Sequence, residues 1–479
     1  MSRRKESGVS MKRIDKSPTD KNLLESMRDN ALGRNDDIVG FVGMLDEMEG
    51  GYSLCVDGPW GSGKTFFVKQ VEMLLRHENS NLMDSYKELE GLAGRKDPPE
   101  PKARQDYLPI YFNAWDVDTF PDPLVALVGT MHAEYPKALV HGLAGSSAGD
   151  LLGLASGVVD LASPIVGLAN PLAGFATKIA AGITKSIGKV AKSFGTKSLI
   201  KSFDDRKNLE SAIDKYVDAL LKDTGDRLVL FVDELDRCEP GFALKLLDEM
   251  KFVTRNDRVI VVYSTCLSQL EKAVGNFYGE GFDAHRYLSR FFDLPPLHLT
   301  RVDGGRYLRL SGHFNADSTL VSNQISEIID VKSLSMRDTN RVISEIDSSR
   351  RALVERPSSS LITFIEDQLF PIAVAIQLTG KELNWHEMAS KGDFGPLWKY
   401  TEDLHLFSTN SEMIANSALP ASSSSSSSTD VWDYLNLLCA CLFSADKEAD
   451  KFESKFYKYM PEYDSIHSAD RSLFSRFRY

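Results

Sequence analysis

The sequence predicts an α/β fold in which helices cover both faces of a parallel sheet, followed by a mainly helical C-terminal region. Five short apolar runs have the length and composition of buried parallel strands: 52–56, 108–112, 228–232, 259–263 and 294–299. Helical patterns separate these runs, and strands that alternate with helices favour a parallel sheet. Strand signals end near residue 300, beyond which the apolar spacing is helical.

The helices expected around the sheet cover about 35–48, 65–77, 122–138, 206–222, 240–252 and 267–278. The second and third strands are separated by far more residues than one crossover helix needs. An insertion is therefore expected between them.

Residues 139–200 form this predicted insertion. They are rich in Gly, Ala, Leu and Val, and lysines recur in their second half. The longest uncharged piece, 161–177, is shorter than the roughly 20 apolar residues that span a bilayer. Three interpretations stay open: a mobile Gly-rich insertion or oligomer contact, an amphipathic Lys-flanked element on a membrane surface, and a membrane-spanning hairpin.

The chain divides into five expected segments. A disordered basic arm at 1–29 precedes a domain at 30–300, which carries the sheet and the insertion. A helical, lid-like domain is expected at 301–408. A Ser-rich linker at 409–430, with an unbroken serine run at 422–428, then leads to a helical segment at 431–479.

The net charge of −12 argues against general coating of nucleic acid, because phosphate neutralisation needs a cationic face. A local basic patch, and with it a nucleic-acid partner, stays open. The basic, polar N-terminus has no apolar segment of the kind found in secretory signals, and the five cysteines have no metal-binding or disulfide spacing. We therefore expect a cytoplasmic protein, with the periphery of the inner membrane as the alternative.

Residues 57–65 read DGPWGSGKT and lie between a predicted strand and a predicted helix. This is the Gly-x-x-x-x-Gly-Lys-Thr pattern of a phosphate-binding loop, and the competing interpretation is a Gly-rich turn with a surface lysine. Glycines let backbone N–H groups approach phosphate oxygens, and the helix N-terminus adds its positive end. We expect Lys64 to reach the β- and γ-phosphates and the Thr65 hydroxyl to bind Mg²⁺. The expected nucleotide-binding residues are Gly58, Pro59, Trp60, Gly61, Ser62, Gly63, Lys64, Thr65 and Phe66.

A second motif follows the third apolar run, in RLVLFVDELDRC at 227–238. Strand burial would hold Asp233 rigidly as a carboxylate that orients Mg²⁺ through water, and Glu234 would polarise an attacking water. An acid directly after the aspartate is typical of P-loop NTPases with an additional strand, most of which hydrolyse ATP. An ordinary strand that ends in a solvated acidic turn is the competing interpretation. No N-K-x-D motif for reading guanine occurs, which favours ATP over GTP.

The fourth run ends in Ser264 and Thr265. Because this strand is expected between the strands of the two motifs, either hydroxyl is a candidate contact for the γ-phosphate or the attacking water. A plain strand-end turn is an equal alternative.

Five segments together resemble the KAP family of P-loop NTPases: DGPWGSGKT at 57–65, YFNAWDVD at 111–118, FVDELDRCEP at 231–240, YLSRFFDLPPLHL at 287–299 and SMRDTNRVISEI at 335–346. The resemblance covers roughly residues 30–350. It implies a STAND/AAA-related ATPase fold, often interrupted by an insertion that carries transmembrane helices in many members. Many members have Asp where this chain has Glu234, and either acid can serve as the base.

The resemblance also draws attention to three arginines. Arg237 is either an arginine that acts on a neighbouring subunit's nucleotide or an ion-pair partner of Asp236. Arg290 precedes the fifth strand and is a candidate sensor of nucleotide state. Arg337 lies where related ATPases place a sensor arginine, with a solvated helical face as an equal alternative. Trp115 is interpreted as a packing residue.

The predicted function is binding and hydrolysis of ATP with Mg²⁺, coupled to assembly or conformational change. The resemblance to bacterial members implies a homo-oligomer and a partner effector protein in an antiphage defence complex. The alternatives are a nucleotide-gated scaffold or a membrane-associated signalling protein with little turnover. A small-molecule kinase is disfavoured because the sequence has no recognisable Arg-rich lid.

Overall fold

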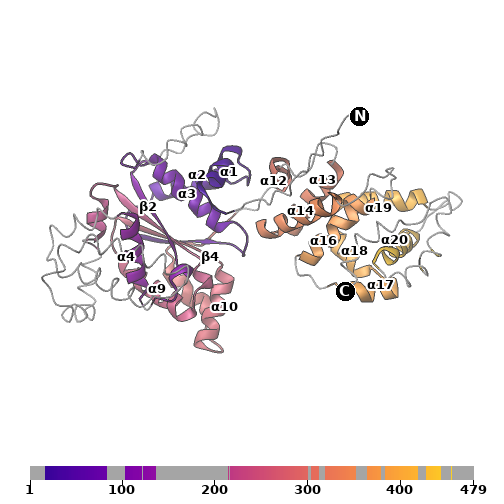
Figure 1. Ribbon diagram of the computed structural model, residues 1–479. Coiled ribbons are helices and arrows are strands. Elements are labelled where there is room, and N and C mark those ends of the chain that lie inside the picture. Colours follow the sequence, from indigo (N-terminus) through magenta and orange to yellow (C-terminus); the bar gives the residue numbers. More distant parts are fainter. Residues whose placement is uncertain are drawn as a thin grey trace, which may run out of the picture. The chain divides into compact units, whose positions relative to one another are not determined.

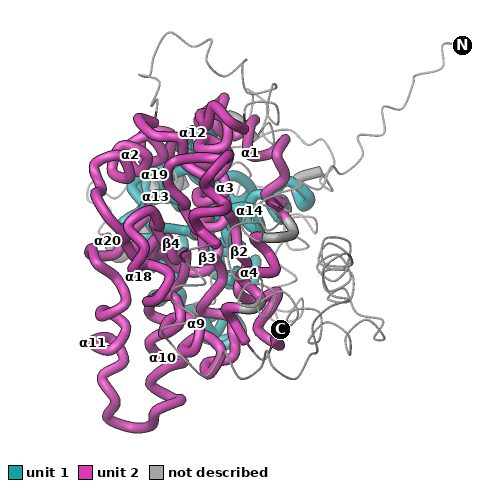
Figure 2. Tube along the Cα trace, turned by 90° about the vertical axis from the view of Figure 1, so that its left-hand side faces the viewer, with its two compact units in different colours: residues 1–15, 31–33, 301–479 teal, residues 16–30, 34–300 magenta. Residues whose placement is uncertain are grey.

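The computed structural model describes residues 17–82, 103–120, 122–135, 214, 216–299, 304–311, 319–351, 364–378, 383–418, 428–443, 452 and 455. The chain divides into two compact units, coloured separately in Figure 2. One unit comprises Lys16–Asn30 and Arg34–Thr300 and contains the sheet. The other contains the helices that follow Arg301.

A five-stranded parallel sheet forms the centre of the first unit, in the order β2-β3-β4-β1-β5 (Figure 1). The strands are β1 (Tyr52–Asp57), β2 (Tyr107–Asn113), β3 (Arg227–Asp233), β4 (Val259–Thr265) and β5 (Leu297–His298). The predicted α/β fold class is thus confirmed. The additional strand β4 separates β1, which enters the phosphate loop, from β3, which carries the acidic motif.

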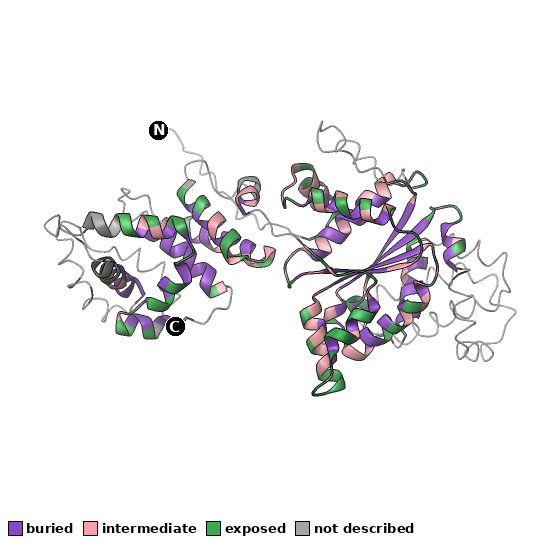
Figure 3. Ribbon diagram, turned by 180° about the vertical axis from the view of Figure 1, so that it is seen from behind, coloured by how far each residue is buried: buried purple, intermediate pink, exposed green. Residues whose placement is uncertain are grey.

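Helices cover both faces of this sheet (Figure 1). The α2 (Asn35–Asp46) and α3 (Lys64–Glu78) helices pack on one face, and α4 (Pro123–Glu134), α9 (Pro240–Val253) and α10 (Leu267–Tyr278) pack on the other. Alternate β4 residues explain this arrangement, since Ile260 and Val262 join the first core while Val259 and Val261 join the second. Figure 3 shows the resulting run of buried positions along the strands.

Shorter elements complete the first unit. They are α1 (Asp20–Asp29), the 3₁₀ turns η3 (Trp115–Val117), η7 (Leu235–Arg237) and η8 (Ser289–Phe291), and α11 (Ala284–Leu288). The η3 and η7 turns follow β2 and β3 directly, so they lie at the carboxyl edge of the sheet.

Helices build the described part of the second unit around a separate apolar core. They are α12 (Gly304–Ser311), α13 (Thr319–Lys332), α14 (Met336–Arg351), the π-helical turn η10 (Ile365–Leu369), α16 (Phe370–Leu378), α17 (Trp385–Lys391), α18 (Gly395–Thr401), α19 (His405–Ala418) and α20 (Ser428–Phe443). The α16 helix is nearly all apolar and lies at the centre of this core.

Three boundaries differ from those expected. Asp20–Asp29 forms α1 inside the segment assigned to a disordered arm, with the Thr19 side chain accepting a bond from the Asn22 amide. The fifth strand is only Leu297–His298 instead of 294–299, because Pro295 and Pro296 have no amide hydrogens for the ladder. Helix α19 runs to Ala418 and α20 begins at Ser428, so part of the segment expected as a linker is helical.

The predicted insertion at 139–200 lies outside the described residues. Within the part of the chain that the structure describes, no helix has the length and apolar character needed to cross a membrane.

Candidate nucleotide site

The phosphate loop joins β1 to α3 at the carboxyl edge of the sheet. Buried Leu54 and Val56 anchor the strand, and the chain then turns through glycines before α3 begins at Lys64. Gly61 and Gly63 have φ values of +81° and +89°, which side chains other than glycine rarely adopt. The predicted strand–loop–helix context of the motif is therefore present.

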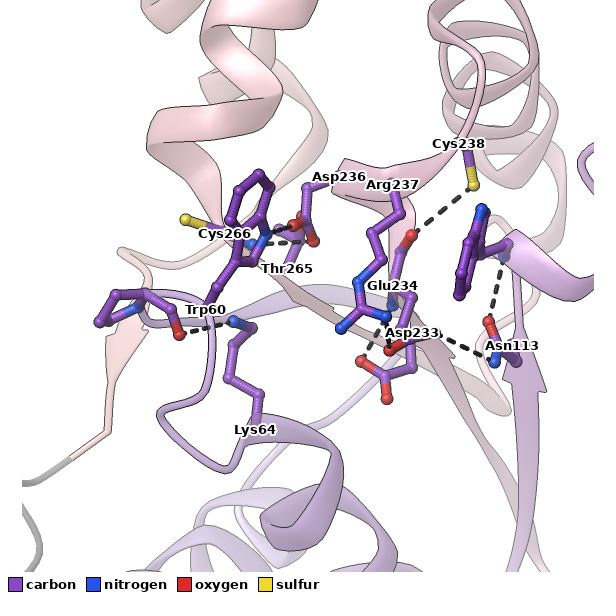
Figure 4. Close-up of polar contacts among 12 residues, drawn as sticks. Trp60, Lys64, Asn113, Asp233, Glu234, Asp236, Arg237, Cys238, Thr265 and Cys266 are labelled. Carbon is purple, nitrogen blue, oxygen red and sulfur yellow. Dashed lines mark hydrogen bonds and ion pairs between the residues drawn. The ribbon is translucent and has the colours of Figure 1, made fainter. Parts of the chain in front are cut away.

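Lys64 points back over this loop (Figure 4). Its Nζ donates to the Gly58 carbonyl at 2.6 Å and to the Pro59 carbonyl at 3.2 Å, and the residue is only 9% exposed. An ammonium group has three donors, so these two bonds hold it in place and leave one N–H for a phosphate oxygen.

The loop closes tightly around its first glycine. A Cβ on Gly58 would lie 2.7 Å from the Ser62 Oγ, so no larger residue fits without a shift. The Ser62 hydroxyl is buried and has no hydrogen-bond partner among the described residues. A phosphate oxygen is a ligand that such a hydroxyl would satisfy. Thr65 and Phe66 follow in the first turn of α3, as expected.

Asp233 ends β3 and is almost fully buried, at 1% exposure. Its Oδ2 accepts a hydrogen bond from the Tyr111 hydroxyl at 2.8 Å, and its Oδ1 accepts one from the Glu234 amide at 2.9 Å. A carboxylate has about four lone-pair positions, so acceptor capacity remains for a Mg²⁺-bound water. The donor set therefore fits the ion that the motif implies, with Thr65 as the second candidate ligand.

Glu234 has an unusual backbone for a non-glycine residue, with φ +61°. Its amide also donates to the Ser264 carbonyl on β4 at 3.2 Å, which ties the turn to the additional strand. Strained φ values of this kind persist where the surrounding structure enforces them and occur often at functional sites.

The Glu234 carboxylate is held by two side chains. Arg237 Nη1 lies 2.8 Å from Oε1 in a salt bridge, and Asn113 Nδ2 donates to Oε2 at 3.3 Å (Figure 4). Burial raises the pKa of Glu234, and the positive charge of Arg237 partly opposes this effect.

The interpretation of Arg237 as a partner of Asp236 is wrong, because its salt bridge is to Glu234. The guanidinium carbon also lies 5.3 Å from the centre of the Trp115 ring. Trp115 is 48% exposed, so it packs against this arginine at the surface and not in the core. Its ring lies beside an arginine at the sheet edge because η3 follows β2 directly.

Ser264 and Thr265 differ in their surroundings. The Thr265 hydroxyl donates to Asp236 Oδ1 at 3.0 Å. The Ser264 hydroxyl is fully buried and has no hydrogen-bond partner among the described residues, and Ser264 is in register with Asp233 on β3. Of the two hydroxyls, Ser264 is therefore the better candidate for a contact with nucleotide or water.

The other two arginines are not brought to the site by any contact of the described residues. Arg290 is exposed in η8, and its side chain interacts electrostatically with Tyr287. Arg337 is exposed in α14, which belongs to the second unit. Their roles as nucleotide sensors stay predictions.

Sequence reasoning missed three residues at the site. Asn113 and Tyr111 reach Glu234 and Asp233 from β2, and their segment YFNAWDVD drew attention only through the family resemblance. Arg34 is 3% exposed just before α2, and its Nη1 lies 3.1 Å from the point that a Cβ on Gly63 would occupy. Burial lowers the pKa of Arg34, and no local pattern in the sequence places it against the loop.

A parallel sheet with an additional strand, a glycine loop that cradles a lysine, and an Asp-Glu pair on the strand two positions away together define a P-loop NTPase domain. The model of the KAP family P-loop domain matches residues 39–353. The chain belongs to this family, whose P-loop domain indicates nucleotide binding. A search of curated proteins finds no match for the chain.

Proposed function

We propose that this chain binds ATP with Mg²⁺ and hydrolyses it, coupling the nucleotide state to assembly or conformational change. The observation that carries the proposal is the position of Glu234. It directly follows the buried Asp233 and lies at the same sheet edge as the Lys64 loop, one strand removed.

Binding would use the loop amides and the remaining N–H of Lys64 for the phosphates. Their positive partial charges suit the triphosphate, and the α3 N-terminus adds to them. Asp233 and Thr65 would hold Mg²⁺, which neutralises charge that develops on the phosphate oxygens.

Hydrolysis would use Glu234 as the general base. The water oxygen forms a bond to the γ-phosphorus, the bond between that phosphorus and the β–γ bridging oxygen breaks, and ADP leaves. The water proton passes to the Glu234 carboxylate. Asn113 orients the carboxylate from β2.

The test measures both binding and turnover in the purified full chain. A fluorescent ATP analogue reports affinity, and phosphate release reports hydrolysis. Lys64→Ala removes a charge-assisted contact and should weaken binding about ten- to hundred-fold. Lys251→Ala, at an exposed lysine of α9, is the matched control. Equal affinity in the Lys64→Ala and wild-type chains would refute the assignment of the loop.

A nucleotide-gated scaffold with little turnover is the second candidate, and the salt bridge between Arg237 and Glu234 favours it. While Arg237 occupies the carboxylate, the base is engaged by a cation and less available to a water. Nucleotide-dependent assembly without phosphate release, measured by size-exclusion chromatography with the partner present, would support this candidate.

The proposed setting is a bacterial antiphage defence complex, with a homo-oligomer and a partner effector protein. It rests on the resemblance to bacterial KAP proteins. The expected location is the cytoplasm, with the periphery of the inner membrane, reached through residues 139–200, as the alternative. Phage plating on cells that express the chain with its neighbouring genes tests the role, and loss of protection in Lys64→Ala is the expected result. Fractionation of the same cells tests the location.

A further inference from the structure

Asp236, in the η7 turn, accepts hydrogen bonds from two other segments of the first unit. Trp60 Nε1 donates to its Oδ2 at 2.5 Å, while the Thr265 hydroxyl and the Cys266 amide donate to its Oδ1 at 3.0 and 3.1 Å (Figure 4). The carboxylate thus joins the phosphate loop, the η7 turn and the end of β4.

Trp60 stands at the tip of the phosphate loop, between Pro59 and the positive-φ Gly61. The residue is 49% exposed, so its ring is not fixed by enclosure in the core. The bond from its indole N–H to a carboxylate is charge-assisted and stronger than a neutral hydrogen bond. This bond therefore restrains the side chain at the tip of the loop.

The first turn of α10 is hydrogen-bonded to the η7 turn and to the end of β1, just before the phosphate loop. Asp236 accepts from the Cys266 amide, and Asp57, which directly precedes the phosphate loop, accepts from the Leu267 amide at 2.9 Å. Carboxylates at a helix N-terminus are favoured by its unpaired amides and dipole. The loop, the turn that follows Glu234 and the N-terminus of α10 are consequently cross-linked by two carboxylates.

We propose that Trp60 and Asp236 are a pair of positioning residues, which fix the tip of the phosphate loop relative to Glu234 and to helix α10. The inference rests on the proposed function, because it assigns the pair to the placement of the phosphates against the base. Placement matters because a reacting group held in the correct geometry contributes strongly to rate, and small shifts remove that contribution. Neither residue needs to touch nucleotide for this role.

Three variants test the pair: Trp60→Phe, Asp236→Asn and the double variant. Trp60→Phe keeps an aromatic ring and removes the N–H donor. Asp236→Asn keeps one acceptor oxygen but weakens the charge-assisted bonds. Asp248→Asn, at an exposed α9 residue, is the charge-matched control.

The first readout is hydrogen exchange of the loop amides at 58–63 in the ligand-free full chain. Each single variant should speed this exchange about ten-fold, the loss expected for one hydrogen bond to a charged group. The double variant should be no faster than Asp236→Asn, because the two residues share one interaction. Asp248→Asn should exchange as the wild type does.

The second readout separates kcat from KM. Each variant of the pair should lower kcat for ATP by a larger factor than it raises KM. The variants lose the placement of the phosphates against Glu234 but keep the hydrogen-bond donors of the loop. Wild-type exchange in both single variants, or additive effects in the double variant, would overturn the inference. Absence of ATP binding or turnover in the wild type would instead overturn the proposed function. Hydrogen exchange would still decide whether the bond between Trp60 and Asp236 restrains the loop.

Discussion

Arg237 and Glu234 are paired within one turn, with 2.8 Å between the guanidinium Nη1 and the carboxylate Oε1. The arginine is itself stacked near Trp115, and the carboxylate is shared with Asn113. The candidate base is thus engaged from two sides before any nucleotide arrives. If Glu234 is the base, as we propose, we expect nucleotide or a partner to break this salt bridge before the carboxylate accepts a proton.

Arg237→Gln should raise basal ATP turnover about five-fold, because an ion pair that is partly exposed restrains the base by about 1 kcal/mol. Turnover of the purified chain checks this, with Arg104→Gln as the control because its partner is Glu47, away from the site. A complete loss of turnover would contradict the restraint and favour the alternative in which Arg237 acts on a neighbouring subunit's nucleotide.

Glu234→Gln keeps the side-chain volume and removes the base. ATP binding should persist while hydrolysis slows by something on the order of 10²–10⁴-fold. Single-turnover hydrolysis and size-exclusion chromatography with Mg-ATP provide the measurement, and the trapped complex should accumulate. Asp233→Asn should behave differently, weakening the binding that depends on Mg²⁺. Normal hydrolysis in Glu234→Gln would remove it as the base.

Gly63→Ala should weaken nucleotide binding roughly ten-fold. The residue has φ +89°, and a left-handed alanine costs about 1–2 kcal/mol. Its Cβ would also lie 3.1 Å from the Arg34 Nη1. Gly40→Ala and Gly43→Ala in α2 are matched controls, because a Cβ at either site meets nothing within 4 Å. Titration with a fluorescent ATP analogue measures the affinity. Unchanged affinity in Gly63→Ala would show that nucleotide binding does not depend on the backbone conformation of Gly63.

Glu249 should make the first unit less stable as pH rises. Burial and the neighbouring Asp122 raise the pKa of Glu249 to about 7, although Lys245 and the Leu124 amide oppose the rise. The folded state therefore holds a proton that the unfolded chain releases near its ordinary pKa, and stability falls between about pH 4.5 and pH 7.

Glu249→Gln removes this titration and should raise the melting temperature at pH 8 more than at pH 5. The gain in the free energy of unfolding at pH 8 is at most about 3 kcal/mol, and loss of the contact with Lys245 reduces it. Thermal unfolding at the two pH values is the measurement. An equal change at both would show that the carboxyl is ionised throughout.

The sheet, the loop and the acidic motif could be predicted because each is encoded locally. Apolar runs at 52–56 and 228–232 define β1 and β3, and glycine spacing defines the turn between β1 and α3. The contacts of Asp236 and Arg237 could not be read in the same way. Both residues lie in one short turn, and the direction of each side chain depends on segments far away in the sequence, which bring Trp60 and Trp115 to the same edge.

Boundaries were harder to predict where the pattern was weak. A polar segment was expected to be disordered through residue 29, yet the cap at Thr19 and buried Leu23 hold Asp20–Asp29 as a helix against α3. The apolar residues at 294–299 predicted a full strand, but Pro295 and Pro296 limit its hydrogen bonding to the sheet.

The strand order has a consequence for biosynthesis. β1 and β3 do not pair with each other, and both hydrogen-bond to β4, which the ribosome makes last of the three. A nascent chain that ends before Val259 holds the phosphate loop and the acidic strand without the strand that joins them. Pairings over such long sequence separations form slowly. Until β4 emerges, the edges of β1 and β3 that pair with it are unpaired, and unpaired strand edges favour aggregation.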